Sequence, residues 1–191
     1  KIGAICAEND LLILCDEIHA DMVFDGRKHI PLASLSPELA RRTITCTSPS
    51  KTFSVAGLVA SVIIIPDPAV REKFIEVRER NSINTGILGL VAMEAAYLHG
   101  DAYADQVRSY LQANRDYAVD YIRKNAPAIT PIVPEATFLL WLDCSGLGLS
   151  KEALEAFFPA AGLRPLARTA PAPLLRLFSR GSRLPLEQPP R

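Results

Sequence analysis

Two short apolar runs in the first third of the chain each end in polar side chains that can do chemistry. Residues 11–15 (LLILC) are followed directly by Asp16. Residues 42–47 (RTITCT) lead into Ser48-Pro49-Ser50-Lys51. Both runs have the length and composition of strands. Because reactive groups of open α/β sheets gather beyond the carboxyl ends of strands, we expect Asp16 and Lys51 at the same edge of a sheet.

A lysine and an aspartate in this arrangement suit a carbonyl cofactor. A partly buried lysine near positive charge has a lowered pKa and can form a Schiff base. An aspartate on the neighbouring strand can pair with a protonated pyridine nitrogen and keep the cofactor electron-withdrawing. The hydroxyls of Ser48 and Ser50 suit a phosphate, although both serines would also serve as turn caps. Together Asp16 and Lys51 predict a site for pyridoxal 5'-phosphate (PLP).

Two other chemistries use the same residue types. The S-x-x-K spacing at 48–51 also occurs around the acylating serine of penicillin-binding proteins and β-lactamases. No S-D-N or K-T-G partner is present, however, and a strand is predicted before the motif. Asp16, Glu17, His19 and Asp21 are possible metal ligands, but neighbours in an extended segment point to opposite sides and no H-E-x-x-H spacing occurs. We therefore expect neither an acylating serine nor a metal site.

Composition narrows the class of protein. The chain has 191 residues, of which 49% are hydrophobic, and its 21 basic residues equal its 21 acidic residues. This balance leaves no surplus charge for a nucleic acid, and no apolar run approaches the roughly 20 residues that cross a bilayer. Four separated cysteines without a C-x-x-C pair indicate a cytoplasmic protein. Lys1 stands first without a signal-peptide pattern, so we expect a piece of a longer protein.

Periodicity predicts strands alternating with helices, and hence an α/β fold. The expected strands are 11–15, 42–47, 58–65 and 137–143, and the expected helices are 69–80, 86–98, 102–125 and 151–158, after a helix-forming start. The segment 86–98 is apolar on most sides and is expected to be buried. Residues 159–191 hold seven of the 15 prolines, six arginines and one acidic residue, which marks a boundary. They are either a disordered basic tail or a stretch where the reading frame departs from the ancestral sequence.

Three separated motifs carry a family resemblance. C-D-E-I-H (15–19), T-S-P-S-K-T-F (47–53) and A-G-L (56–58) occur in the order of the class I/II aminotransferases of PLP fold type I, which the chain resembles. H-A-D (19–21), I-P-L-A-S-L (30–35) and P-E-A-T-F-L-L-W-L-D (134–143) resemble most closely the branch of cystathionine β-lyase-like C–S lyases. The resemblance covers residues 1–158.

The resemblance implies an architecture. Residues 1–100 would form part of a PLP-binding large domain with a mainly parallel sheet. Residues 101–158 would form a small α+β C-terminal domain, and 159–191 a divergent tail rich in proline and arginine. The N-terminal part of the family would precede Lys1. Members of this family are homodimers, so the full-length protein is expected to be one.

The resemblance also assigns roles to residues. Lys51 would be the cofactor-binding lysine and the catalytic base, Asp16 would bond the pyridine nitrogen, and Ser48 would bind the phosphate with Ser50 as a second candidate. His19 falls where many relatives have a tyrosine that contacts the cofactor's phenolic oxygen, and a structural histidine is the alternative. Ser54 stands where relatives commonly have asparagine. No arginine is assigned to the substrate carboxylate.

The function implied is a PLP-dependent C–S β-lyase that cleaves cysteine thioethers such as cystathionine to pyruvate, ammonia and a thiol. A PLP-dependent aminotransferase of amino acids is the alternative, because Lys51 and Asp16 serve both reactions. A second alternative is an inactive fragment, or a relative that acts only through protein contacts.

Overall fold

The computed structural model describes residues 1–160, 162 and 174–178. The chain divides into two compact units, Lys1–Ser109 and Tyr110–Arg191. The division falls inside a long helix, α5 (Asp101–Asn125). Among the described residues, no helix has the length and apolar character needed to cross a membrane.

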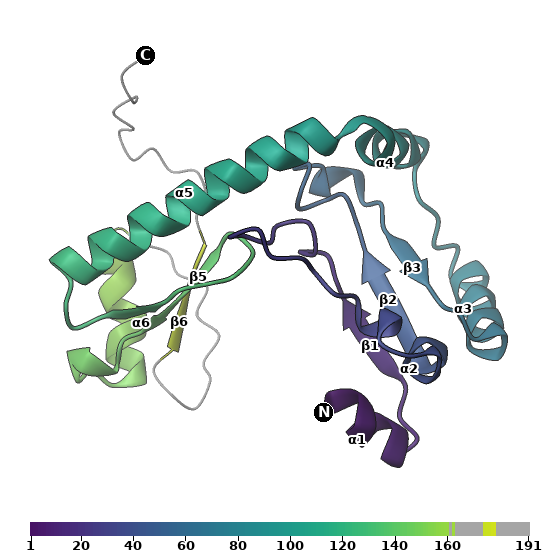
Figure 1. The fold of residues 1–191 in the computed structure, drawn as a ribbon, viewed down its shortest axis with the longest axis horizontal. Coiled ribbons are helices and arrows are strands. Elements are labelled where there is room, and N and C mark those ends of the chain that lie inside the picture. Colours follow the sequence, from purple (N-terminus) through teal and green to yellow (C-terminus); the bar gives the residue numbers. More distant parts are fainter. Residues whose placement is uncertain (161, 163–173, 179–191) are drawn as a thin grey trace. The chain divides into compact units, whose positions relative to one another are not determined.

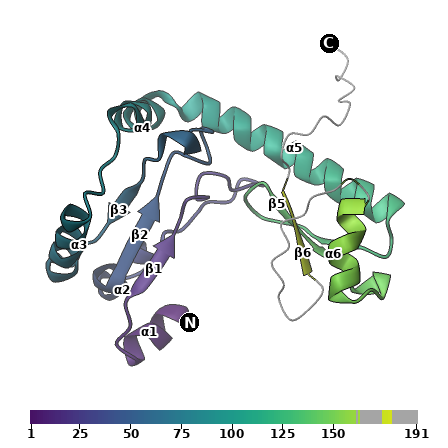
Figure 2. The ribbon, with the colours of Figure 1, turned by 180° about the vertical axis from the view of Figure 1, so that it is seen from behind.

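The first unit contains a three-stranded sheet of order β1-β2-β3 (Figure 1). β1 (Ile13–Asp16) runs parallel to β2 (Thr43–Thr47), whereas β3 (Val62–Ile64) is antiparallel to β2. Figure 2 shows this sheet from behind, with β1 and β3 at its two edges. In this unit the predicted parallel pairing therefore holds for β1 and β2, and β3 departs from it.

Four helices complete the first unit along with the start of α5. They are α1 (Ile2–Glu8), α2 (Pro37–Arg42), α3 (Pro68–Arg80) and α4 (Ile87–His99). The caps explain two starting points, because the side chains of Ser36 and Asp67 accept hydrogen bonds from the N–H groups of Leu39 and Val70, and a proline follows each cap. The helices expected at 69–80, 86–98 and 102–125 are confirmed. Helix α2 was not expected.

Two expectations about the first unit are wrong. The strand expected at 58–65 begins only at Val62, since Ala56–Leu58 form a 3₁₀ turn and Val59 has a left-handed φ of 49°, which a strand cannot contain. The second error concerns burial. The segment 86–98 was expected to be buried, but Ile87 and Leu88 of α4 are 71% and 70% exposed. Apolar character predicts that a face is to be covered, but not that this chain supplies the cover.

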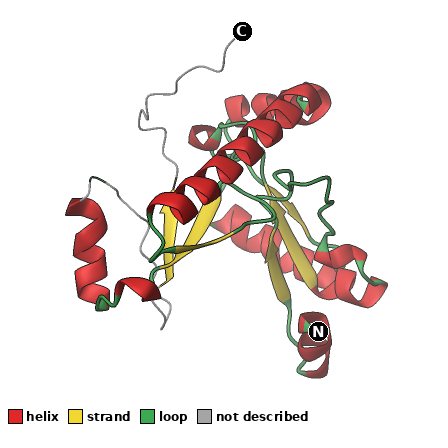
Figure 3. Cartoon of the chain, turned by 60° about the vertical axis from the view of Figure 1, so that its left-hand side comes forward, coloured by secondary structure: helices red, strands yellow, loops and turns green. Residues whose placement is uncertain are grey.

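The second unit has an antiparallel sheet of order β4-β5-β6 and the helix α6 (Lys151–Ala160) (Figure 3). Its strands are β4 (Thr130–Ile132), β5 (Leu139–Asp143) and β6 (Leu174–Phe178). Leu142 and Cys144 pack with Leu154 and Phe158 of α6 in a buried cluster. The sequence prediction missed β4, whose segment contains prolines. β6 shows that residues 174–178 are not a disordered tail, while most of 159–191 lies outside the described residues.

Candidate active site

Asp16 is the last residue of β1 and stands at the carboxyl end of the parallel strand pair. Its backbone partner on β2 is Cys46, and the N–H of the next residue, Glu17, donates to the Cys46 carbonyl at 2.8 Å. The Asp16 side chain is exposed, and its Oδ1 accepts a hydrogen bond from the Ile18 N–H at 3.1 Å. This bond fixes the carboxylate while its second oxygen still has lone pairs for a ligand.

Lys51 lies in a tight loop that begins directly after β2. The Phe53 N–H donates to the Pro49 carbonyl at 2.9 Å, which closes a turn around the lysine. Ser48, Pro49 and Thr52 are buried, whereas Lys51 is only half-buried. The loop is therefore anchored on both sides of Lys51. Since β1 and β2 are parallel, this loop and Asp16 both lie beyond the carboxyl ends of the two strands, as the sequence predicted.

The two serines beside Lys51 are joined to each other. Ser48 Oγ donates to the Ala60 carbonyl at 2.6 Å, so its only proton is used there. The hydrogen bond between Ser48 and Ser50 must then be donated by Ser50, and the Ser50 N–H also donates to Ser48 Oγ at 3.1 Å. Neither hydroxyl has a free proton in this arrangement. Rotation of the half-buried Ser50 hydroxyl breaks fewer bonds than rotation of buried Ser48, which has three.

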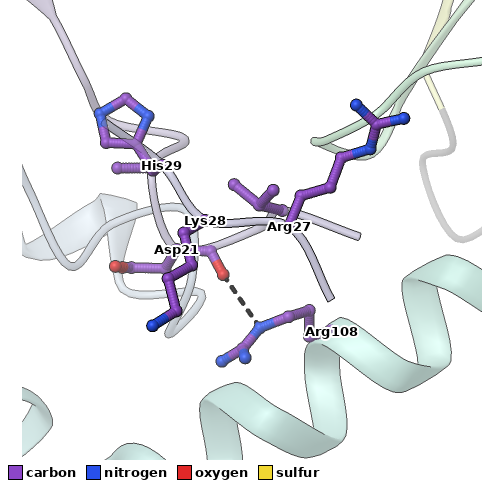
Figure 4. A pocket seen from close by; sticks show the side chains of 7 residues that line it. Asp21, Arg27, Lys28, His29 and Arg108 are labelled. Atoms are coloured by element: carbon purple, nitrogen blue, oxygen red, sulfur yellow. Dashed lines mark hydrogen bonds between the residues drawn. The ribbon is translucent and has the colours of Figure 1, made fainter. Parts of the chain in front are cut away.

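Thr52 ties the lysine loop to the segment that follows β1. Its hydroxyl donates to Asp21 Oδ2 at 2.8 Å, across 31 positions of sequence, and Thr52 is only 1% exposed. Asp21 is held from the other end as well, because Arg108 Nε donates to its backbone carbonyl at 3.2 Å (Figure 4). Sequence reasoning named Asp21 in the H-A-D motif and as one of four metal-ligand types that were not expected to form a site, and it assigned no role to Thr52 or Arg108. The H-A-D and K-T-F strings were the available signal.

A surface pocket of about 220 Å³ lies beside Asp21 (Figure 4). It is lined by Ala20, Asp21, Val23, Arg27, Lys28, His29 and Arg108. Arg108 is also paired with Asp105 at 2.9 Å, and His29 Nε2 contacts Glu17 Oε2 at 3.2 Å. Two of the basic side chains of the pocket are therefore used in contacts within the protein.

Phe53 fixes the far end of the lysine loop in an aromatic cluster. Its ring stacks on Tyr103, with centroids 5.8 Å apart, and meets Tyr97 edge-on at 6.5 Å. Gly100 leaves room for the ring, since a Cβ there would collide with Phe53 Cε1. Burial and the charge of Asp21 raise the pKa of Tyr97, against a hydrogen bond with Thr47. Tyr97 thus stays protonated between the end of β2 and Asp21.

Glu17 follows Asp16 and is buried. Its Oε1 accepts hydrogen bonds from the Leu32 N–H at 3.1 Å and from the Cys15 thiol at 3.3 Å. Burial alone would raise its pKa, but the bonds from Leu32, His29 and Cys15 outweigh burial and lower it. Glu17 is therefore a charged clamp between β1 and the 29–32 segment. For Cys15, burial and the nearby carboxylates raise the pKa of the thiol to about 11.

His19 lies in the turn after β1, half-buried, and its carbonyl accepts the Met22 N–H at 3.1 Å. The structure thus brings Asp16 and His19 from one loop, and Ser48, Ser50 and Lys51 from the next, to the same end of the sheet. Within the described residues, no group of three His, Cys, Asp or Glu side chains is arranged to hold a metal ion.

The family model for aminotransferase class I and II matches residues 1–163. The chain belongs to the class I and II aminotransferase family. It is 40% identical over 156 residues to cystathionine β-lyase PatB of Bacillus subtilis (strain 168), and 33% identical over 146 residues to a cystathionine β-lyase of Corynebacterium glutamicum. The family predicted from the motifs is thereby confirmed.

A solved structure gives the same result for the fold. Cystalysin from Treponema denticola, which contains PLP, superposes with a TM-score of 0.81 at 30% identity, covering 93% of this chain and 46% of that one. The predicted α/β fold of type I is confirmed by this likeness. PatB is matched over 81% of this chain and 40% of its own length, and the C. glutamicum relative over 76% and 39%. This member of the family therefore spans about two fifths of those curated relatives.

Proposed function

We propose that this chain carries the lysine-bearing part of a PLP-dependent C–S β-lyase that acts on cysteine thioethers such as cystathionine. The anchored Lys51 loop, set beside Asp16 at the carboxyl edge of the sheet, is the observation that carries the proposal. The similarity to two cystathionine β-lyases and to cystalysin supports it. The four free cysteines support a cytoplasmic site of action.

The donor set fits PLP in chemical type. Lys51 supplies an amine, the exposed Asp16 carboxylate supplies an acceptor for a protonated ring nitrogen, and Ser50 supplies a hydroxyl at the loop. His19 is within the same group of loops and is proposed to contact the ring's phenolic oxygen. Ser48 is proposed for the phosphate, but the bond to Ala60 gives it a structural role first.

Bound PLP supplies an electron sink that makes the α-proton of an amino acid acidic. Asp16 holds the proton on the pyridine nitrogen and so keeps that sink effective. Lys51 removes the α-proton, and its half-buried position beside a turn limits the directions in which the amine moves. The electron pair that the α-proton leaves behind would form a Cα=Cβ double bond while the Cβ–S bond breaks with its own pair on sulfur, and water would then convert the unsaturated product to pyruvate and ammonia.

Covalent trapping tests this proposal. The purified chain is mixed with PLP, reduced with borohydride and mapped by mass spectrometry. We expect label on Lys51, no label there in Lys51→Arg, and unchanged labelling in Lys73→Arg, a control on α3. Absence of label, or label scattered over surface lysines, contradicts a cofactor site in this chain.

Product analysis separates the alternatives. Pyruvate and thiol released from cystathionine indicate the lyase. Transfer of the amino group to a 2-oxo acid indicates an aminotransferase, the alternative that the family's name favours. A chain labelled at Lys51 that releases neither product supports the non-catalytic alternative. We also propose a homodimer for the full-length protein, which the exposed apolar faces of β1 and α4 support.

A further inference from the structure

Asp21 is the point at which three segments of the first unit meet. Its carboxylate accepts the Thr52 hydroxyl at 2.8 Å, and its carbonyl accepts Arg108 Nε at 3.2 Å (Figure 4). Arg108 is itself oriented by Asp105 at 2.9 Å. The loop after β1 is thus tied to α5 through the Asp21 backbone and to the lysine loop through its side chain.

Thr52 fixes the lysine loop through the hydrogen bond of its buried hydroxyl. It is 1% exposed and next to Lys51, inside the turn that the Phe53 N–H closes on the Pro49 carbonyl. A buried hydroxyl needs a hydrogen-bond partner, and Asp21 provides a charged one, which is stronger than a neutral partner. The peptide that carries Lys51 is therefore fixed relative to β1, the strand that bears Asp16.

From this geometry we propose that Asp21 is a positioning residue for Lys51, acting through Thr52 and held in place by Arg108. The inference rests on the proposed role of Lys51. Asp21 itself touches neither cofactor nor substrate in this scheme. Its function is to keep the amine of Lys51 at a fixed place relative to Asp16, so that one ligand can engage both.

Labelling of Lys51 as a function of PLP concentration tests this. Loss of a charge-assisted hydrogen bond is expected to raise the half-saturating PLP concentration about tenfold in Asp21→Ala and in Thr52→Val. The double variant should be no worse than either single one, because both remove the same bond. Thr52→Ser keeps the hydroxyl and should remain near the parent value, while Glu94→Ala, an exposed carboxylate on α4, serves as the matched control.

Hydrogen exchange provides a readout that needs no cofactor. The Phe53 amide, bonded to the Pro49 carbonyl, should exchange about tenfold faster in Asp21→Ala. Thermal melts show whether the variants are folded. If Asp21→Ala does not fold, Thr52→Val serves in its place, because valine keeps the shape of the threonine side chain. Parent-like exchange in both variants overturns the inference. If Asp21→Ala and Thr52→Val are both labelled on Lys51 at the parent's half-saturating PLP concentration, the inference is overturned and the proposed function stands. If the parent chain itself carries no label on Lys51, the proposed function fails and the inference fails with it.

Discussion

Val59 shows how a single residue's backbone shapes the surroundings of Lys51. It has φ of 49° and ψ of 55°, and its side chain is 79% exposed. A left-handed conformation costs a non-glycine residue about 1–2 kcal/mol, and most of all a β-branched one. The exposed valine gains little packing in return. The strain is imposed because the chain must turn sharply between the Ala56–Leu58 turn and the buried Ala60, whose carbonyl holds Ser48.

Replacement of Val59 by glycine should therefore stabilise the protein. Relief of the left-handed strain exceeds the entropic cost of glycine, so we expect the free energy of unfolding to rise by about 0.5–1 kcal/mol. Urea denaturation measures this as a higher midpoint with an unchanged slope. Val55→Gly is the control: its φ is −107°, and the same exchange there should lower the midpoint. Equal effects at the two positions would show that Val59 is not strained.

At the scale of elements, the site depends on how the end of β1 is joined to the segment that follows it. Glu17 bonds Leu32 and His29 and so closes the loop over the strand end. The pKa of Glu17 is lowered in the folded protein. A group of this kind contributes stability above its unfolded pKa, near 4.3, and the contribution is lost as the pH falls through the lower folded value.

Glu17→Gln should expose that contribution. At pH 7 the variant loses a charged acceptor, which is expected to cost about 1–3 kcal/mol of unfolding free energy. The difference between parent and variant should shrink once the pH falls below about 4, as the parent carboxyl is protonated. Urea denaturation at several pH values measures both the loss of unfolding free energy at pH 7 and its decrease at low pH. Glu72→Gln on the exposed face of α3 should show neither, and a difference that stays constant down to pH 3 would contradict the assignment.

The sequence predicted the features that depend on local signals, and it did not predict those that depend on contacts between distant segments. Asp16 and Lys51 were found because strand ends and polar residue types are local signals. Val59 was wrongly placed in a strand because its conformation is set by the turn before it rather than by its β propensity. Thr52 and Asp21 lie 31 positions apart, and although each falls in a family motif, neither motif indicates the hydrogen bond between them. Strand β4 was missed because its partner β5, not its own proline-containing sequence, holds it.

At the scale of the whole chain, one copy leaves several large apolar side chains of the first unit exposed to solvent. Leu11, Leu12 and Leu14 around β1 are 50%, 57% and 72% exposed, and Ile87 and Leu88 of α4 are 70% or more. Within the described residues, the outer edge of β1 has no strand partner. Full burial of an exposed side chain of this kind contributes about 1.5–3 kcal/mol, and each of these partly exposed residues contributes a share of that, so several together favour association.

We therefore expect the purified chain to associate with a second copy through the exposed leucines around β1, at a mass above the 20.8 kDa of one chain. Sedimentation velocity over a range of concentrations measures it. Leu14→Lys puts a charge on the exposed face of β1 and should shift the chain toward the monomer, whereas Tyr117→Lys, at a 66% exposed position of the second unit, should not. A parent chain that sediments as a monomer at every concentration would show that these faces do not drive self-association, and equal effects of the two variants would place the contact elsewhere.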